Sequence, residues 1–196
     1  MKLLLARHGE TSYNRARKFY GTADVSLDAR GRNQAQELAK KLMVCQPTVL
    51  VQTNLKRTHQ TLAPLCHHFP RLPVITLPDL AEKGFGDWEG LDADEIESRY
   101  PAEWQKWLQA PLTYTPPTNE SFAHFTKRVQ RGLAWLEKHL TTDDVAVVIA
   151  HLGSIRIIYQ QLVDPSADFY DLDFKAACYS AITIDGSTVT DVKLNQ

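Results

Sequence analysis

The sequence predicts an α/β fold: a three-layer α/β/α sandwich with a mostly parallel central sheet and a small helical lid insertion. Short apolar segments of strand length alternate along the chain with longer segments whose apolar residues recur at helical spacing. This alternation is typical of parallel strands joined by helices that cover both faces of the sheet. The 196 residues suit a single domain spanning 1–196, which can bury a substantial core.

The first predicted strand is the apolar run Leu3–Ala6, whose lack of polar residues is typical of a strand buried on both faces. A loop containing Gly21 follows it, and a helix is expected to begin near Asp28. The apolar residues of this helix fall on one face at the i, i+3, i+4, i+7 spacing: Ala35, Leu38, Ala39 and Leu42.

The next strand–helix–strand unit follows the same logic. Val49–Val51 is a short β-branched and apolar run that predicts a second strand. A helix is expected from about Lys56, and the prolines at 70 and 73 end it. Val74–Leu77 then predicts a third strand.

The middle of the chain, 81–117, differs in character from what precedes it. It holds three of the four tryptophans and four prolines, and short helices are expected at 92–100 and 101–108. We interpret it as an insertion that folds over the main sheet, where lids and specificity elements are often found. Trp104 and Trp107 lie three residues apart on the second short helix, a spacing that favours core packing over stacking on a ligand.

A long helix is expected from about Ser121 to Leu140, with Asn119 or Thr118 as its N-cap. Its apolar residues form one stripe: Phe122, Phe125, Val129, Leu133, Leu136 and Leu140.

Three further elements complete the predicted fold. The unbroken apolar run Val145–Ala150 predicts a central strand, and Ile155–Leu162 a helix. Tyr179–Asp185 and Thr188–Leu194 flank a Gly-Ser turn and predict an antiparallel pair. This pair could serve as an edge between chains, so we expect a monomer or a homodimer.

Composition excludes several classes of partner. The formal net charge of −1 gives no general attraction to nucleic acid or to anionic membranes, so we expect neither as a partner. The three widely spaced cysteines form no C-x-x-C pair, which favours small core residues in a reducing compartment. No apolar run is long enough for a signal peptide or a membrane span, so we expect a cytoplasmic protein.

Charged side chains follow the predicted strands where each one ends. Arg7 and His8 follow the first strand, His151 follows the strand 145–150, and Arg57 lies on the first turn of the helix after the second strand. Ligands of open α/β sheets bind at the carboxyl ends of strands, near helix N-termini. If these strands are neighbours, the two guanidinium groups and two imidazoles converge on a site for a small, highly charged anion. Phosphate fits this set best, because the planar fork of arginine suits its oxygens.

Zinc is the competing ligand, because histidine binds it readily. The chain has no H-E-x-x-H sequence and no clustered spacing of metal ligands, and the adjacent arginines would repel a dication. We therefore expect no metal ion and no other cofactor, and a small-molecule phosphate ester as the ligand.

Five segments, taken in order, resemble the histidine phosphatase superfamily, the phosphoglycerate mutase-like proteins. LARHGET carries its R-H-G signature, and GTADVSLDARGRNQAQ is similar to the loop and helix that follow it. TNLKRTHQT, LAEKGFGDWEG and VVIAHLGSIR are similar to the segments that carry its second arginine, its acid and its second histidine. The resemblance covers nearly the whole chain, and the four motifs that carry Arg7-His8, Arg57, Glu82 and His151 are specific when taken together.

The resemblance implies a phosphohistidine mechanism. His8 would attack phosphorus as the neutral imidazole, with its pKa lowered by Arg7 and Arg57. The same arginines and His151 would stabilise charge on the phosphate oxygens in the transition state. Glu82 would protonate the leaving group and then activate the water that hydrolyses the intermediate.

The resemblance also implies four further members of the substrate site. Asn14 would donate to a phosphate oxygen, and Tyr20, Gly21 and Leu152 would belong to the pocket. Glu10 is a rival carboxylate, but it would repel the phosphate and is expected to face away from it.

FGDWEG, PPTNESFAHFTKRV and CYSAITID resemble the α-ribazole phosphatase branch of the superfamily. The chain departs from the common pattern at Thr53-Asn54, at Asn119 before Glu120-Ser121, and at Leu152. These positions are expected to shape the rim of the pocket, and therefore specificity.

The alternatives to a phosphatase acting on α-ribazole 5'-phosphate are a broad-specificity small-molecule phosphatase and a cofactor-dependent phosphoglycerate mutase. Such mutases resemble this chain in their phosphohistidine chemistry but are usually longer, with extra segments that bind the second phosphate. A phosphate-binding module without catalysis is the alternative from another class, and the presence of both histidines, both arginines and a candidate acid argues against it.

Overall fold

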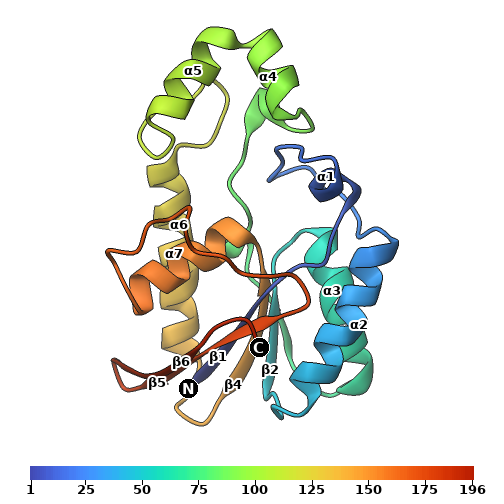
Figure 1. Ribbon diagram of the computed structural model, residues 1–196. Coiled ribbons are helices and arrows are strands. Elements are labelled where there is room, and N and C mark those ends of the chain that lie inside the picture. Colours follow the sequence, from blue (N-terminus) through green and yellow to red (C-terminus); the bar gives the residue numbers. More distant parts are fainter.

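The computed structural model describes all residues, 1–196, and shows a six-stranded sheet between two layers of helices (Figure 1). The strand order is β3-β2-β4-β1-β5-β6. The strands are β1 (Lys2–Arg7), β2 (Val49–Gln52), β3 (Val74–Thr76), β4 (Val145–Ala150), β5 (Tyr179–Asp185) and β6 (Thr188–Lys193). The first four are mutually parallel, and β5 and β6 extend the sheet antiparallel beside β1.

Seven α-helices and two 3-10 turns accompany the sheet. The α-helices are α1 (Ser12–Arg15), α2 (Ala29–Met43), α3 (Lys56–His68), α4 (Ala93–Arg99), α5 (Pro101–Gln109), α6 (Phe122–His139) and α7 (Leu152–Leu162). The 3-10 turns are η1 (Pro78–Leu80) and η2 (Gly86–Trp88). The predicted fold class is confirmed, and the parallel strands β1, β2 and β4 are covered on both faces.

The alternation of side chains along the central strands creates two separate cores. In β1, Leu3 and Leu5 pack against α6 and α7, while Leu4 and Ala6 face α2 and α3. The same division recurs in β2 and β4, whose residues are buried on both faces. At about 25 cal/mol per Å² of apolar surface, burial on both faces strongly stabilises this arrangement.

The parallel register brings the site residues to one edge of the sheet. Arg7 of β1 is paired with Ala150 of β4, so the residues that follow these strands, His8 and His151, are neighbours. Gln52 of β2 is paired with Ile149, which brings the N-terminus of α3 to the same edge. The predicted convergence of strand ends therefore follows from the order β2-β4-β1.

The helices α4 and α5 lie apart from the sheet, beyond the carboxyl ends of the parallel strands (Figure 1). They are held by an aromatic cluster of their own, in which Trp88, Ile96 and Trp104 are buried. Phe19, from the loop after α1, packs edge-on against Trp88 and Trp107. That the segment 81–117 acts as a lid stays a prediction.

Several expected boundaries were wrong in detail. Ser121, and neither Asn119 nor Thr118, caps α6, because its hydroxyl oxygen accepts from the backbone N–H of His124. The last helix begins at Leu152, three residues earlier than expected, directly after β4. The single-turn helix α1 was not predicted, because four residues show no periodicity. None of the helices combines the length and the apolar composition that a membrane span requires.

Candidate active site

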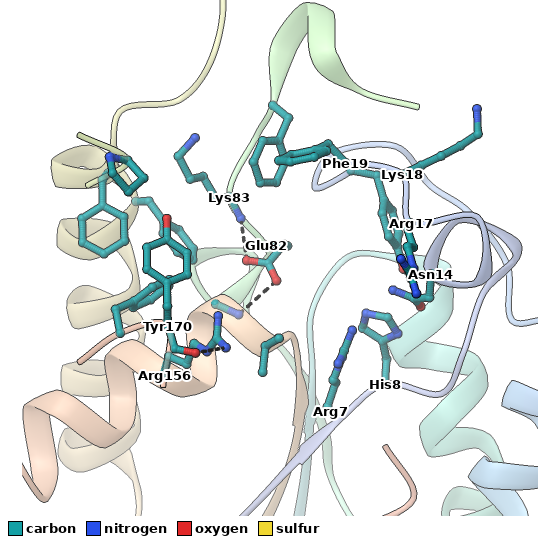
Figure 2. Close-up of a pocket in the computed structure, with 18 of the residues that line it drawn as sticks. Arg7, His8, Asn14, Arg17, Lys18, Phe19, Glu82, Lys83, Arg156 and Tyr170 are labelled. Atoms are coloured by element: carbon teal, nitrogen blue, oxygen red, sulfur yellow. Dashed lines mark hydrogen bonds between the residues drawn. The ribbon is translucent and has the colours of Figure 1, made fainter. Parts of the chain in front are cut away.

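A cavity of about 330 Å³ opens at the carboxyl ends of β1 and β4 (Figure 2). Its walls come from the end of β1, the α1 loop, α3, the segment 82–85, and the helices α5, α6 and α7. Six basic side chains line it: Arg7, Arg17, Lys18, Arg57, Lys83 and Arg156. Glu82 supplies the one carboxylate of the lining. The cavity is therefore strongly cationic in a protein of net charge −1.

His8 is nearly fully buried and held as one tautomer. Its Nδ1 lies 2.8 Å from the carbonyl oxygen of Gly9. Because a carbonyl only accepts, Nδ1 carries the proton, and Nε2 of the neutral ring keeps its lone pair. Burial, and then the charges of Arg57 and Arg7, lower the pKa of His8 well below its ordinary value. The expected direction is confirmed, but burial contributes more than the arginines.

The loop that carries His8 is fixed from α3 and α2. The backbone N–H of Gly9 donates to the hydroxyl of Thr61, which itself donates to the carbonyl of Arg57. A Cβ at Gly9 would lie 2.5 Å from the carbonyl oxygen of Gly31, so only glycine permits this approach of the loop to α2. Sequence reasoning missed Thr61, a buried hydroxyl one turn after Arg57.

Arg57 is fully buried and its guanidinium is fixed by three acceptors. It donates to the carbonyl oxygens of Gly21 at 2.8 Å and Ala23 at 2.9 Å, and from Nε to Nδ1 of His151 at 3.3 Å. Its charged plane also lies 4.7 Å from the ring centre of Tyr20. An arginine held this rigidly presents fixed positive charge to a ligand in the cavity.

His151 lies beside His8, with ring centres 5.1 Å apart, but both of its ring nitrogens are engaged by the protein. Nδ1 accepts from Arg57, so Nε2 carries the proton and donates to the hydroxyl of Thr53. Burial, and then Arg57 and His8, lower the pKa of His151 well below its ordinary value. The His151 ring thus orients Arg57 through this hydrogen bond, and His151 does not line the cavity.

Asn14 is oriented by three donors on one atom. Its Oδ1 accepts from the backbone N–H and hydroxyl of Thr11 and from the hydroxyl of Tyr20, at 2.9–3.1 Å. Because a backbone N–H only donates, the amide oxygen must face Thr11, which leaves the amide NH₂ free at the cavity. Arg7 lines the cavity at the end of β1, and its guanidinium makes no hydrogen bond within the protein.

Tyr20 and Gly21 occupy different positions relative to the cavity. Tyr20 lines it and is buried. Gly21 does not line it, because its carbonyl is bonded to Arg57 and its N–H to the carboxylate of Glu89. Glu89 binds the backbone of this whole loop, and sequence reasoning missed it.

The carboxylate of Glu82 is held at the cavity by two backbone N–H groups (Figure 2). Oε1 accepts from Lys83 at 3.0 Å and Oε2 from Gly153 at 3.1 Å. A Cβ at Gly153 would lie 2.4 Å from Oε1, so a larger residue at the start of α7 would displace this carboxylate. Glu10, the rival carboxylate, faces Arg15 and Arg30 and does not line the cavity.

Two of the departures from the family pattern lie away from the rim, contrary to expectation. Thr53 is fully buried behind His151, where its hydroxyl accepts from the ring. Asn119 and Glu120 line a separate cavity of about 560 Å³. Leu152 does line the main cavity, at the N-terminus of α7.

Arg17, Lys18, Lys83 and Arg156 line the cavity and were missed by sequence reasoning. Arg156 is anchored by the carbonyl oxygens of Tyr170 and Leu172, on the side of the cavity away from His8 (Figure 2). Its place on α7, five residues after His151, was the available signal. No group of three or more His, Cys, Asp and Glu side chains is arranged to hold a metal ion.

The chain is similar in sequence and in fold to known phosphatases. A model of the histidine phosphatase superfamily (branch 1) matches residues 3–196. Phosphoserine phosphatase 1 of Hydrogenobacter thermophilus is 29% identical, across 100% of this chain and 92% of the relative. Adenosylcobalamin/α-ribazole phosphatase of Escherichia coli is 30% identical, across 100% of this chain and 96% of the relative. The crystal structure of a putative α-ribazole-5'-P phosphatase from Escherichia coli superimposes with a TM-score of 0.91, at 30% identity and with 100% and 96% of the two chains covered.

Proposed function

The chain belongs to the histidine phosphatase superfamily and is a phosphoric monoester hydrolase, and from that premise we propose that it acts through a phosphohistidine on His8, without a metal ion. The observation that carries the proposal is the tautomer of His8. Its Nδ1 is bonded to the carbonyl of Gly9, so the nitrogen with the free lone pair is Nε2, in a cavity rich in positive charge.

In the first step, Nε2 of His8 attacks phosphorus and the bond from phosphorus to the ester oxygen breaks. Arg7, Arg57 and the amide of Asn14 stabilise the charge on the phosphate oxygens. Glu82 donates its proton to the departing alkoxide, which leaves as an alcohol. His151 contributes by orienting Arg57, because its Nδ1 accepts a hydrogen bond from Nε of Arg57 at 3.3 Å.

In the second step, water attacks phosphorus and the bond to Nε2 breaks. Glu82, now a carboxylate, takes the proton of the attacking water, and His8 returns to its neutral form. Inorganic phosphate leaves, and Glu82 is protonated for the next cycle. The mechanism needs no metal ion, because the arginines supply the positive charge that a metal ion supplies elsewhere.

For the substrate, we propose a small phosphate ester whose alcohol carries an aromatic ring, with α-ribazole 5'-phosphate as the first candidate. Two groups of aromatic side chains line the cavity and support this proposal. In one group Phe19 packs against Phe85 and Trp107, and in the other Phe169 packs against Phe122 and Tyr170. The relative from Escherichia coli whose name includes α-ribazole phosphatase, 30% identical over the whole chain, supports the same candidate.

The test is phosphate release in excess EDTA, with the wild type beside His8→Ala. The panel holds α-ribazole 5'-phosphate, para-nitrophenyl phosphate, phosphoserine, 3-phosphoglycerate and several sugar phosphates. Turnover that survives EDTA and is lost in His8→Ala supports the mechanism, and activity that needs a metal ion or persists without His8 overturns it. Similar rates on all esters would favour a broad-specificity phosphatase. Transfer of phosphate between bisphosphoglycerate and 3-phosphoglycerate would favour a mutase.

A further inference from the structure

A partly buried ion pair, which lines the separate cavity of about 560 Å³, holds the segment that carries Glu82. Arg128 of α6 and Glu120 are paired at 2.7 Å, and their side chains are only 12% and 14% exposed. Arg128 uses all five of its N–H groups. Two donate to the Glu120 carboxylate, and three donate to the carbonyl oxygens of Asp79, Ala81 and Glu82, at 2.6–3.1 Å.

Glu120 holds the backbone on the other side of Glu82, at Gly84. Its Oε2 accepts from the backbone N–H of Gly84 at 3.0 Å, and Oε1 also contacts Nδ1 of His124. The backbone is therefore tied to one ion pair on both sides of the proposed acid. Burial alone would raise the pKa of Glu120, but Arg128 and the N–H of Gly84 outweigh it and lower the pKa to about 2. The carboxylate is thus charged whenever the enzyme works at neutral pH.

The Glu82 carboxylate is oriented by the N–H of Gly153, which donates to Oε2 at 3.1 Å. A Cβ at residue 153 would lie 2.4 Å from Oε1 and would displace the carboxylate from this position. A backbone shift at 81–84 would move the acid away from the ester oxygen, and misplacement of about 1 Å can lower a rate by about a hundredfold.

We propose that Arg128, with its fork fixed by Glu120, is the positioning residue that aims Glu82 at the leaving group. This inference rests on the proposed role of Glu82 as the general acid. Arg128 does not itself line the cavity, and it makes no hydrogen bond to the phosphate-binding side chains. It contacts the cavity wall at the ring of Phe125, 4.8 Å from its guanidinium, and its hydrogen bonds reach the proposed acid through the segment 79–84. A lysine could not replace it, because one ammonium cannot reach three carbonyls and a carboxylate at once.

The experiment compares kcat/KM for two esters. Para-nitrophenolate leaves without needing a proton, whereas the alkoxide of an alkyl phosphate such as β-glycerophosphate needs one. The ratio of the alkyl to the nitrophenyl value reports acid catalysis, and it does not change if part of the protein is merely unfolded. Glu82→Gln sets the ratio expected when the acid is lost.

For Arg128→Met we expect the ratio to fall at least about tenfold, in the direction of Glu82→Gln. Glu120→Gln, which keeps the shape of the side chain, should lower it in the same direction by a smaller factor. Arg128→Lys should not restore it. Arg131→Met is the matched control, because Arg131 is an exposed arginine of the same helix that bonds only the side chain of Asp79. Its ratio should equal that of the wild type.

The outcomes separate two failures. If Glu82→Gln lowers both rates equally, Glu82 is not the acid and the proposed mechanism is wrong. If Glu82→Gln lowers the ratio but Arg128→Met and Glu120→Gln leave it unchanged, or Arg128→Lys restores it, the positioning role is wrong. Should Arg128→Met fail to fold, Glu120→Gln alone decides.

Discussion

The Nδ1 atom of His8 donates a hydrogen bond to the carbonyl oxygen of Gly9 at 2.8 Å. This contact between neighbouring residues assigns the proton to the inner nitrogen and the lone pair to the outer one. The backbone thus selects the reactive atom of the proposed nucleophile, and the surrounding burial and positive charge keep the ring neutral.

The first prediction concerns the protonation of His8. Its folded pKa is depressed below the ordinary 6.5 by burial, Arg57 and Arg7, so the ring stays neutral as pH falls through the ordinary value. The contribution of His8 to stability is therefore full above pH 6.5 and decreases below it. In NMR spectra we expect the titration midpoint of the His8 ring to lie below the ordinary 6.5. A midpoint at or above 6.5 would contradict the electrostatic account.

The second prediction concerns Asn14→Asp. Aspartate keeps an oxygen for the donors from Thr11 and Tyr20, so the fold of α1 should survive. It loses the NH₂ donor and adds negative charge beside the phosphate. We expect kcat/KM to fall about a hundredfold or more, with little change in the unfolding temperature. An activity close to that of the wild type would remove Asn14 from the phosphate site.

The third prediction is that substitutions of the two tryptophans of α5 have different effects, one mainly on stability and the other mainly on substrate preference. Trp104 is buried with Trp88 and Ile96, whereas Trp107 stacks on Trp104 at 5.2 Å and lines the cavity. We expect Trp104→Ala to lower the free energy of unfolding by about 3 kcal/mol. Trp107→Ala should lower it less and raise KM for aromatic esters more than for alkyl esters. Denaturant titrations and kinetics on both esters check this, and equal effects of the two variants would refute the division.

The fourth prediction is that the charge of Glu120 makes the free energy of unfolding sensitive to acid. Its folded pKa of about 2 lies below the ordinary 4.5, so its contribution is full above pH 4.5 and is lost as pH falls toward 2. Because solvent screens this partly exposed pair, the shift corresponds to at most roughly 3 kcal/mol at neutral pH. The stability difference between wild type and Glu120→Gln should therefore be large at pH 7 and shrink over that acid range. A difference independent of pH would show that the pair contributes no charge-dependent stability.

Sequence reasoning succeeded where a pattern is local. The apolar runs of β1 and β4 predicted where Arg7, His8 and His151 would lie, because parallel strands end at one edge of the sheet. Helix boundaries were less accurate: Thr118, Asn119 and Ser121 are all good caps in sequence, and only the structure selects Ser121.

The remaining features of the site depend on tertiary contacts that no spacing reveals. Arg156 reaches the cavity because the loop after α7 offers the carbonyls of Tyr170 and Leu172 to its side chain. The engagement of both ring nitrogens of His151 depends on Arg57 and Thr53, about a hundred residues earlier. Burial, the largest cause of the low pKa of His8, is likewise a property of the folded chain.

The central claim is that phosphate is carried on Nε2 of His8. The most direct measurement is to mix Glu82→Gln with para-nitrophenyl phosphate, quench in base to preserve phosphohistidine, and identify the modified atom by mass spectrometry and ³¹P NMR. We predict one phosphoryl group, on Nε2 of His8, which disappears in the His8→Ala, Glu82→Gln double variant. Phosphate on Nδ1, on His151 or on no residue at all would contradict the account.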